Sequence, residues 1–291
     1  MTKKLRKAVF PVAGLGTRLL PATKAIPKEL LTVVDRPLIQ YAVDEAREAG
    51  IEQLIFVTGR GKSTLVDYFD MAFELETTMR EKGKSLGPLE SSRVHFGELV
   101  SVRQQQPLGL GHAVWCAREI VGNEPFAVLL PDVLVQAKRS CLAQMIDAYN
   151  ELGEKANVLA VEPISPEVVH MYGVVGVGPT KGKAFQVTGM VEKPPRGTAP
   201  SNLHITGRYI LQPTIFNLLA HQEKGAGGEI QLTDSMIALS RQEAFHAVRF
   251  DGDIYDTGSK IGFLTANIAY ALDRADLGPE LRAEIEKLIE R

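Results

Sequence analysis

The sequence contains few cysteines and no long apolar run. Its two cysteines, Cys116 and Cys141, lack the spacing of a metal site, which excludes a disulfide-rich scaffold and a zinc-binding module. We expect both to be buried thiols in a reducing compartment. No stretch of the chain approaches the roughly 20 consecutive apolar residues that are needed to span a bilayer.

The basic N-terminus also lacks the full pattern of a secretory signal. Lys3 and Lys4 precede an apolar stretch, as they would in a signal peptide. That stretch is broken by Pro11 and Gly14 and closed by Arg18, without a small-residue cleavage pattern. We therefore predict a cytoplasmic protein with no membrane partner.

A strong charge of either sign is missing as well. The 33 lysines and arginines nearly balance the 35 aspartates and glutamates, for a formal net charge of -2. Such a balance gives no general attraction to nucleic acid or to acidic membranes, so we predict no nucleic-acid partner. Any binding of phosphate must therefore depend on a local group of basic side chains.

Such a group follows a glycine-containing loop near the N-terminus. The apolar run Ala8–Val12 predicts a short buried strand, and Gly14–Arg18 (GLGTR) follows it. The two glycines allow a sharp turn and leave backbone N–H groups open to a ligand. Arg18 is joined by Lys24 and Lys28 within fifteen residues, which suits a polyphosphate better than a neutral ligand.

Two common nucleotide-binding motifs do not fit the chain. A dinucleotide fingerprint needs a third glycine where Leu19 stands. Gly59–Thr64 (GRGKST) ends like a P-loop, but the glycine required five positions before Gly61 is Phe56. We interpret Gly59–Thr64 as a strand-to-helix turn rather than a phosphate site.

The order of apolar segments predicts an α/β fold. Strand-like runs alternate with helical patterns such as Pro37–Ala49 and Lys62 to about Arg80, which favours a Rossmann-like, mostly parallel sheet with helices on both faces. Beyond residue 155, four strand-like runs follow one another with few helices between them, namely Val158–Glu162, Tyr172–Val177, Phe185–Glu192 and Leu203–Leu211. We predict one domain over residues 1–270, with a first lobe of about 1–155 and a β-rich second lobe of about 156–258.

The remaining residues, 271–291, predict a helical tail. Pro279 suits the first turn of a helix, and Leu281, Ile285, Leu288 and Ile289 share one apolar face. This face either packs on the core or supports a subunit contact. We expect a homo-oligomer, either a dimer or a tetramer.

The N-terminal loop resembles the signature of the sugar-nucleotide pyrophosphorylases, a family of nucleotidyltransferases. The signature runs G-x-G-T-R, then a proline, then a lysine, as Gly14–Arg18, Pro21 and Lys28 do here. Similar motifs recur in the family's order at Gly109–Ala113, Leu130–Asp132, Tyr172–Val175, Val191–Pro194, Ala199–Leu203, Gly207–Tyr209 and Gly228–Asp234. The resemblance covers about residues 5–270, and Pro21–Glu29 (PATKAIPKE) is most similar to bacterial members that use UTP and glucose 1-phosphate.

The resemblance implies transfer of a nucleotidyl group to a sugar phosphate. A phosphate oxygen of the sugar attacks the α-phosphorus of the triphosphate, in line with the leaving pyrophosphate. This chemistry needs positioning and charge neutralisation more than a strong base. The backbone at Ala13 and Gly14 would approach the nucleotide, and Arg18 and Lys28 would hold its phosphates as part of the catalytic set.

The same resemblance assigns residues to the base and ribose. Glu29, Gln104 and Gly109 fall where the family contacts these groups. A glutamine can both donate to and accept from a uracil edge, so the role is chemically reasonable for Gln104. Because Gln104 begins a run of three glutamines, a solvated surface residue is the alternative.

Two aspartates match the metal pair of the family. Asp132 ends the apolar run 126–131, where an unpartnered charge would be costly, and Asp256 follows another strand-like stretch. Mg²⁺ prefers one or two carboxylates together with water and phosphate oxygens. We predict Mg²⁺ at Asp132 and Asp256, with a helix cap or a surface turn as the alternative for Asp132.

The sugar phosphate is assigned to the second lobe. Lys193 resembles the family lysine that holds the phosphate of the attacking sugar, and Glu192 resembles the residue that accepts from its hydroxyls. Adjacent strand residues point to opposite faces, so both can contact one ligand only if the chain bends near Pro194. Gly173 and the backbone near Ile205 are expected to line the sugar. A surface ion pair is the alternative for Glu192 and Lys193.

Together these features predict a Mg²⁺-dependent enzyme that joins UTP and glucose 1-phosphate. A thymidylyltransferase acting on the same sugar phosphate is the nearest rival. A nucleotide-sensing homologue without catalysis is another, but it should lack part of the set Arg18, Lys28, Asp132, Lys193 and Asp256. All five are present.

Overall fold

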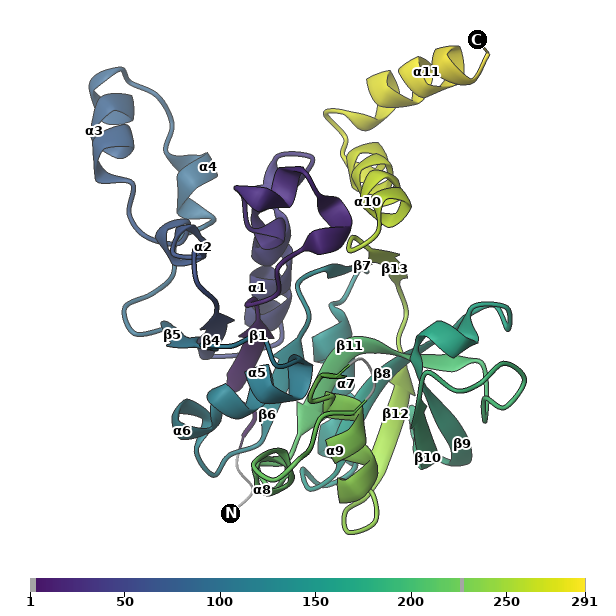
Figure 1. The fold of residues 1–291 in the computed structure, drawn as a ribbon. Helices are drawn as coiled ribbons and strands as arrows, with labels where there is room; N and C mark the ends of the chain where they lie inside the picture. Colours follow the sequence, from purple (N-terminus) through teal and green to yellow (C-terminus); the bar gives the residue numbers. More distant parts are fainter. Residues whose placement is uncertain (1–3, 226–227, 291) are drawn as a thin grey trace.

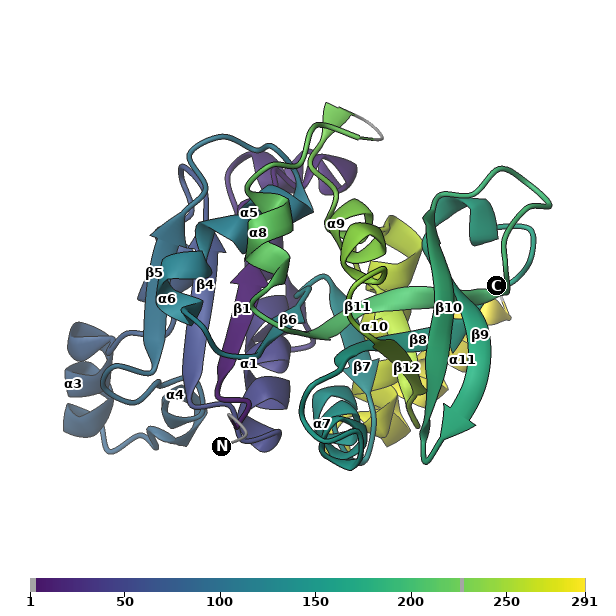
Figure 2. The same ribbon diagram turned by 90° about the horizontal axis from the view of Figure 1, so that it is seen from below.

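The central feature of the protein is a nine-stranded sheet. The computed structural model describes residues 4–225 and 228–290, and the strand order in the sheet is β5-β4-β1-β6-β11-β8-β12-β10-β9 (Figures 1 and 2). The strands of this sheet are β1 (Lys7–Pro11), β4 (Gln53–Thr58), β5 (Leu99–Arg103), β6 (Phe126–Leu129), β8 (Asn157–Pro163), β9 (Gly173–Lys181), β10 (Ala184–Glu192), β11 (Leu203–Leu211) and β12 (Phe245–Arg249). One sheet therefore runs through both predicted lobes.

The sheet is mixed, but most of its strands share one direction. β5, β4, β1 and β6 pair in parallel, and only β11 and β10 run against the common direction in the described part of this sheet. Ala8, Val9 and Phe10 in β1 are completely buried, because helices cover both faces of the parallel half. The prediction of an α/β fold with a mostly parallel sheet is confirmed.

Helices form a layer on each face of the sheet. The α-helices among the described residues are α1 (Leu38–Glu48), α2 (Thr64–Asp67), α3 (Phe73–Glu81), α4 (Gly87–Glu90), α5 (Leu110–Cys116), α6 (Arg118–Val121), α7 (Cys141–Glu151), α8 (Ile215–Leu219), α9 (Leu232–Leu239), α10 (Lys260–Asp273) and α11 (Gly278–Ile289). α1 and α7 pack against one face, while α5, α6, α8 and α9 pack against the other. Single-turn 3₁₀ helices span Thr17–Leu19, Ala22–Lys24, Lys28–Leu30 and Val169–Met171.

Two small sheets lie beside the large one. β2 (Thr32–Val33) pairs with β3 (Arg36–Pro37), and β7 (Val133–Gln136) pairs with β13 (Asp253–Asp256), both antiparallel. The second pair joins a segment that follows β6 to a segment that precedes α10, more than a hundred residues later. Its register sets Val133 opposite Asp256, and this places two distant parts of the chain together at one edge.

The prediction of one helix from Lys62 to about Arg80 is wrong. The chain instead forms the short α2 and then α3, with a break between them. Leu65 and Phe69 pack into the core, whereas Met71 and Phe73 are exposed because α3 projects away from the body (Figure 1). The two segments do not share one apolar face, because the first packs on the core and the second is exposed. The helical periodicity of the sequence therefore does not continue through the break.

The C-terminal helices form a second projection. α10 and α11 extend from the body on the side opposite the arm formed by α3 and α4 (Figure 1). The predicted tail, residues 271–291, does contain helix, but the first of its two helices already begins at Lys260. No helix among the described residues is both long and apolar enough to cross a bilayer.

Candidate active site

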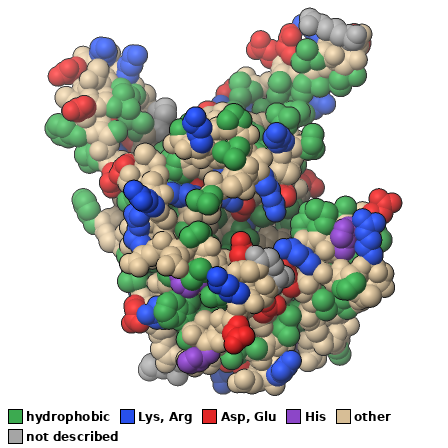
Figure 3. Space-filling view, viewed as in Figure 1, with side chains coloured by type: hydrophobic (Ala, Val, Ile, Leu, Met, Phe, Trp, Pro, Cys, Tyr) green, Lys and Arg blue, Asp and Glu red, His purple; other side chains and the backbone are tan. Residues whose placement is uncertain are grey.

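Three loops that follow strands meet at one edge of the parallel half-sheet. The loops after β1 and β5 lead into helices, whereas the loop after β6 leads into β7 (Val133–Gln136). Together they bring Ala13, Gly14, Arg18, Gln104, Gly109 and Asp132 to a single cleft of about 600 Å³, which Lys28 also lines. These loops meet because the carboxyl ends of parallel strands share one edge of the sheet. In the space-filling view several Lys and Arg side chains lie over the middle of this face, between the two projecting arms (Figure 3).

The glycine loop folds back on the segment that follows it. Gly16 has a φ of 67°, a left-handed conformation that favours glycine. A Cβ there would lie 3.2 Å from both Thr23 Cβ and Lys28 Cβ, and the hydroxyl of Thr23 donates to the Gly16 carbonyl at 2.8 Å. This close approach brings Arg18 and Lys28 to the same cleft, although ten residues separate them.

Lys28 and Asp132 form an ion pair in the cleft. Lys28 Nζ lies 2.6 Å from Asp132 Oδ2, and both side chains are largely buried. Burial raises the pKa of Asp132, but the charge and hydrogen bond of Lys28 outweigh it, so the net pKa is lowered. Burial lowers the pKa of Lys28, and Asp132 and Glu29 reverse that effect to give a raised pKa. Both groups therefore keep their charges near neutral pH.

The two predicted metal ligands converge beside Gly258. A Cβ on that glycine would lie 3.0 Å from Asp256 Oδ1, 3.4 Å from Asp132 Oδ2 and 3.8 Å from Arg18 Nη1. Pairing of β7 with β13 causes this convergence, and Thr257 reinforces it by donating from its backbone N and its hydroxyl to the Asp132 carbonyl at 2.9 and 2.8 Å. Asp132 is therefore not a helix cap.

This pair of carboxylates fits a magnesium ion. No group of three or more His, Cys, Asp or Glu side chains within residues 4–225 and 228–290 is arranged to hold a metal. Mg²⁺ does not need such a group, because it keeps several waters and takes further oxygens from substrate phosphates. Asp132 and Asp256 can supply the protein ligands, and Arg18 lies close enough to contact the same phosphates.

Glu29 lies outside the lining of the cleft. It is almost fully buried and accepts from Lys62 at 2.7 Å, while its second carboxylate oxygen has no hydrogen-bond partner among the described residues. Burial raises the pKa of Glu29 and lowers that of Lys62. Lys62 belongs to the segment Gly59–Thr64, which forms a turn after β4 as predicted. The assignment of Glu29 to the base or ribose remains a prediction.

Gln104 and Gly109 form one corner of the cleft. Gln104 is buried rather than solvated, and its Nε2 donates to the Gly109 carbonyl at 3.0 Å. Gly109 has a φ of 111°, and a Cβ there would lie 2.7 Å from the carbonyl oxygen of Ile230. Glycine is required because the segment of Glu229 and Ile230 packs directly on this loop. Sequence reasoning quoted that segment as a motif but gave it no role.

The predicted sugar site also comes together. A Cβ on Gly173 would lie 2.8 Å from Glu192 Oε2, 3.5 Å from Thr233 Oγ1 and 3.6 Å from Ile205 Cδ1. Three of these residues were predicted from the resemblance, and Thr233 was missed. Its only sequence signal was its place in the motif Gly228–Asp234.

The chain bends at Lys193, as contact with a single ligand requires. Lys193 has a φ of 48°, a left-handed conformation that is uncommon for a residue with a side chain. The bend turns its Nζ to within 3.9 Å of Glu192 Oε1, although neighbouring strand residues would otherwise face apart. Lys193 is about half exposed, so its ammonium group is open to an anion.

β11 connects the two halves of the site, because it pairs with β6, which leads to Asp132, and with β9, which begins at Gly173. Burial raises the pKa of the Tyr209 phenol on β11, and the carboxylates of Glu192 and Asp132 raise it further, while Arg208 lowers it. Glu192 belongs to the predicted sugar site and Asp132 to the predicted metal site. Both candidate subsites therefore border β11.

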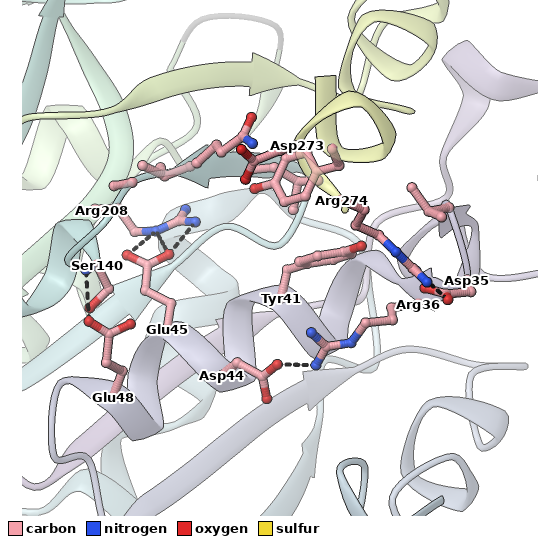
Figure 4. A pocket seen from close by; sticks show the side chains of 16 residues that line it. Asp35, Arg36, Tyr41, Asp44, Glu45, Glu48, Ser140, Arg208, Asp273 and Arg274 are labelled. Carbon is pink, nitrogen blue, oxygen red and sulfur yellow. Dashed lines mark hydrogen bonds and ion pairs between the residues drawn. The ribbon is translucent and has the colours of Figure 1, made fainter. Parts of the chain in front are cut away.

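A fully buried arginine supports the segment that carries Asp132. Arg208 donates to the carbonyls of Leu130 and Val133 at 3.0 and 2.7 Å, on either side of Asp132. Its guanidinium also pairs with Glu45 of α1 at 2.9 Å (Figure 4). Sequence reasoning quoted Arg208 within a family motif without a role, and it did not single out Glu45.

Comparison with known proteins extends the similarity over almost the whole chain. The profile described as nucleotidyl transferase matches residues 7–272. The UTP–glucose-1-phosphate uridylyltransferase of Komagataeibacter xylinus is 54% identical over 263 residues, which cover 90% of this chain and 92% of that protein. The protein of the same name from Bacillus subtilis (strain 168) is 47% identical over 290 residues, which cover 99% of each. A UTP-bound UGPase structure from Acinetobacter baumannii has a TM-score of 0.90 at 46% identity, covering 98% of this chain and 100% of that one.

Proposed function

The chain belongs to the nucleotidyl transferase family, and from this premise we propose that it converts UTP and α-D-glucose 1-phosphate into UDP-glucose and pyrophosphate. A phosphate oxygen of the sugar phosphate forms a bond to the α-phosphorus of UTP. The bond from that phosphorus to the bridging oxygen breaks, and its electron pair leaves with pyrophosphate. The convergence of Arg18, Asp132 and Asp256 beside a cleft lined by Gln104 carries this proposal.

Each side chain has a distinct task in this reaction. Arg18 and Lys28 hold the triphosphate and offset its negative charge, while the bend at Lys193 directs an ammonium group at the attacking phosphate. Mg²⁺ at Asp132 and Asp256 would supply further charge neutralisation on the phosphate oxygens. The proposed reaction depends on placing the reactants in line, so it needs no covalent intermediate on the protein.

A grid of substrates tests the function and its nearest rival. Uracil and thymine present the same hydrogen-bonding edge and differ by one methyl group, which is worth about 1–3 kcal/mol in a pocket. We expect UTP to exceed dTTP by about 10- to 200-fold in kcat/KM, with very little use of ATP or GTP. Pyrophosphate release with each nucleotide at saturating glucose 1-phosphate measures this. Equal or better use of dTTP would support the thymidylyltransferase alternative.

Two single substitutions separate the two phosphate contacts. Arg18→Ala should weaken the use of UTP, whereas Lys193→Ala should chiefly raise the KM for glucose 1-phosphate. A hydrogen bond to a charged group is worth about 1.5–3 kcal/mol, so each loss should be about 10- to 150-fold. Initial rates with one substrate varied and the other saturating give both KM values.

Arg196→Ala is the matched control for Lys193→Ala. Arg196 is exposed and lies three residues further along the same loop. We expect both of its KM values to stay near those of the unmodified protein. If Arg18→Ala and Lys193→Ala weakened the same substrate by the same factor, the division into two phosphate sites would be wrong.

Homo-oligomer formation and a cytoplasmic location remain predictions. An exposed apolar row on α10, formed by Ile261, Leu264 and Ile268, supports the first of them. α11 adds Leu288 and Ile289, which are also exposed. These helices offer a subunit contact of the kind that the tail sequence predicted.

A further inference from the structure

Gln104 uses both hydrogens of its amide group within the protein. Its Nε2 lies 3.0 Å from the Gly109 carbonyl oxygen and 3.0 Å from His112 Nδ1. A carbonyl oxygen can only accept, so the amide nitrogen, not the amide oxygen, must face Gly109. This contact fixes which way the amide points. Within residues 4–225 and 228–290, Oε1 receives no hydrogen bond and is the atom left for a ligand.

The orientation of Gln104 in turn fixes the state of His112. Because an NH₂ group faces Nδ1, that nitrogen must carry a lone pair, and the ring hydrogen lies on Nε2. Burial lowers the pKa of His112, which favours this neutral ring. Trp115 stacks against the imidazole at a centroid distance of 5.9 Å, and Cys116 Sγ lies 3.8 Å from Nδ1. The helix α5 therefore holds the ring as a fixed acceptor.

We propose that His112 determines which pyrimidine the cleft accepts, as a positioning residue that acts through Gln104. Together with the Gly109 carbonyl, it presents Oε1 of Gln104 to the base as a hydrogen-bond acceptor. Uracil offers an N–H at ring position 3 to that oxygen, whereas cytosine has a lone pair there and is repelled. Thymine has the same N–H as uracil, so His112 selects against cytosine and leaves the methyl group to be recognised elsewhere.

This inference rests on the proposed use of UTP, and it assigns a role to a residue that touches no substrate. If His112 had only a structural role, its substitution would lower kcat/KM for UTP and for CTP by the same factor. A positioning role predicts that substitution of His112 lowers kcat/KM for UTP and leaves kcat/KM for CTP unchanged. It also predicts that the effect disappears once Gln104 is absent, because His112 acts only through that side chain.

The test is a double-mutant cycle with two nucleotides. kcat/KM for UTP and for CTP is measured for the unmodified protein, His112→Phe, Gln104→Ala and the double variant, at saturating glucose 1-phosphate. Phe keeps the ring that stacks on Trp115 but has no acceptor. Loss of one buried hydrogen bond of about 1–2 kcal/mol predicts a roughly 5- to 30-fold fall for UTP, mainly in KM, and no fall for CTP. In the Gln104→Ala background the same substitution should change UTP use by less than about twofold.

Two further variants keep the result decisive. His112→Asn places an amide oxygen near the position of Nδ1 and should restore much of the preference for UTP. His112→Ala provides a second acceptor-free variant if the Phe variant is unfolded, as judged by its thermal midpoint. Equal losses for UTP and CTP, or additive effects in the cycle, would overturn the role of His112. Failure of the unmodified protein to use UTP at all would instead overturn the proposed function.

Discussion

Replacing Asp132 with asparagine is expected to lower kcat by about 10³-fold or more, with little change in stability. A metal ion that neutralises developing phosphate charge is worth several kcal/mol, and each 1.36 kcal/mol is tenfold in rate. Asparagine keeps the size of the side chain and can still accept from Lys28, but it offers no charge to Mg²⁺. Excess EDTA should abolish turnover of the unmodified protein for the same reason, and added Mg²⁺ should restore it.

Asp253→Asn is the matched control for this substitution. Asp253 lies on the same strand as Asp256, but it is exposed and pairs with Gln136 at the far end of β13. Its replacement should leave kcat and the Mg²⁺ requirement unchanged. Titration of Mg²⁺ at saturating substrates gives the apparent metal affinity of each variant. Substantial turnover in EDTA, or an Asp132→Asn protein that is as active as the control, would rule out the metal mechanism.

The parallel half of the fold could be predicted because its signals are local. The apolar run of β1 is buried on both faces, and the helix expected over Pro37–Ala49 forms as Leu38–Glu48. Strand ends that share a direction must share an edge, so the meeting of the loops after β1, β5 and β6 followed from topology alone. The wrong prediction of a single helix after Lys62 shows the limit of this reasoning. Periodicity shows which residues would share a helix face, but it does not show whether the fold provides a surface for that face to pack against.

The family motifs indicated which distant residues act together, which topology alone could not indicate. Nothing in the local sequence places Asp132 beside Asp256, since their contact depends on the pairing of β7 with β13. The bend that both Glu192 and Lys193 require was predicted near Pro194, and it occurs at Lys193 itself. A left-handed residue with a long side chain has no sequence signature, because tertiary contacts must overcome its local strain.

Buried polar contacts were the least predictable part of the site. Glu45 lies within the periodic pattern of α1, where a glutamate normally faces solvent, yet it is only 8% exposed. The reason is Arg208, which lies 163 residues away in the sequence and is 1% exposed. No local pattern reports on such a partner. The same holds for His112, whose contact with Gln104 depends on how the loop after β5 meets α5.

The buried pair of Glu45 and Arg208 leads to the largest expected effect on stability. Removing one partner of a buried ion pair leaves an uncompensated charge and costs about 3–5 kcal/mol. The entropy of unfolding is about 2.1 cal/mol/K per residue, or about 0.6 kcal/mol/K for this chain of 291 residues. Glu45→Ala should therefore lower the thermal midpoint by about 5–8 °C. Glu45→Gln, which keeps one acceptor oxygen for Arg208, should lower it by less.

Glu48→Ala provides the control from the same helix. Glu48 is exposed and accepts one hydrogen bond, from the backbone N of Ser140 at 2.9 Å (Figure 4). Its loss should cost no more than about 1.5 kcal/mol, or less than about 3 °C. Thermal unfolding followed by circular dichroism at one protein concentration compares the three variants. Equal shifts for Glu45→Ala and Glu48→Ala would show that Arg208 does not depend on its buried partner.

Replacing both partners separates the charge from the hydrogen bonds. Where a buried pair contributes only charge, exchange for apolar residues of similar size is often neutral or stabilising. Arg208 also donates to the carbonyls of Leu130 and Val133, which an apolar side chain cannot do. Buried acceptors that lose a donor cost about 1–3 kcal/mol each, so the Glu45→Met, Arg208→Met double variant should remain about 3 °C or more below the unmodified protein. A double variant as stable as the unmodified protein would mean that those carbonyls find other partners, and that the segment carrying Asp132 does not need Arg208.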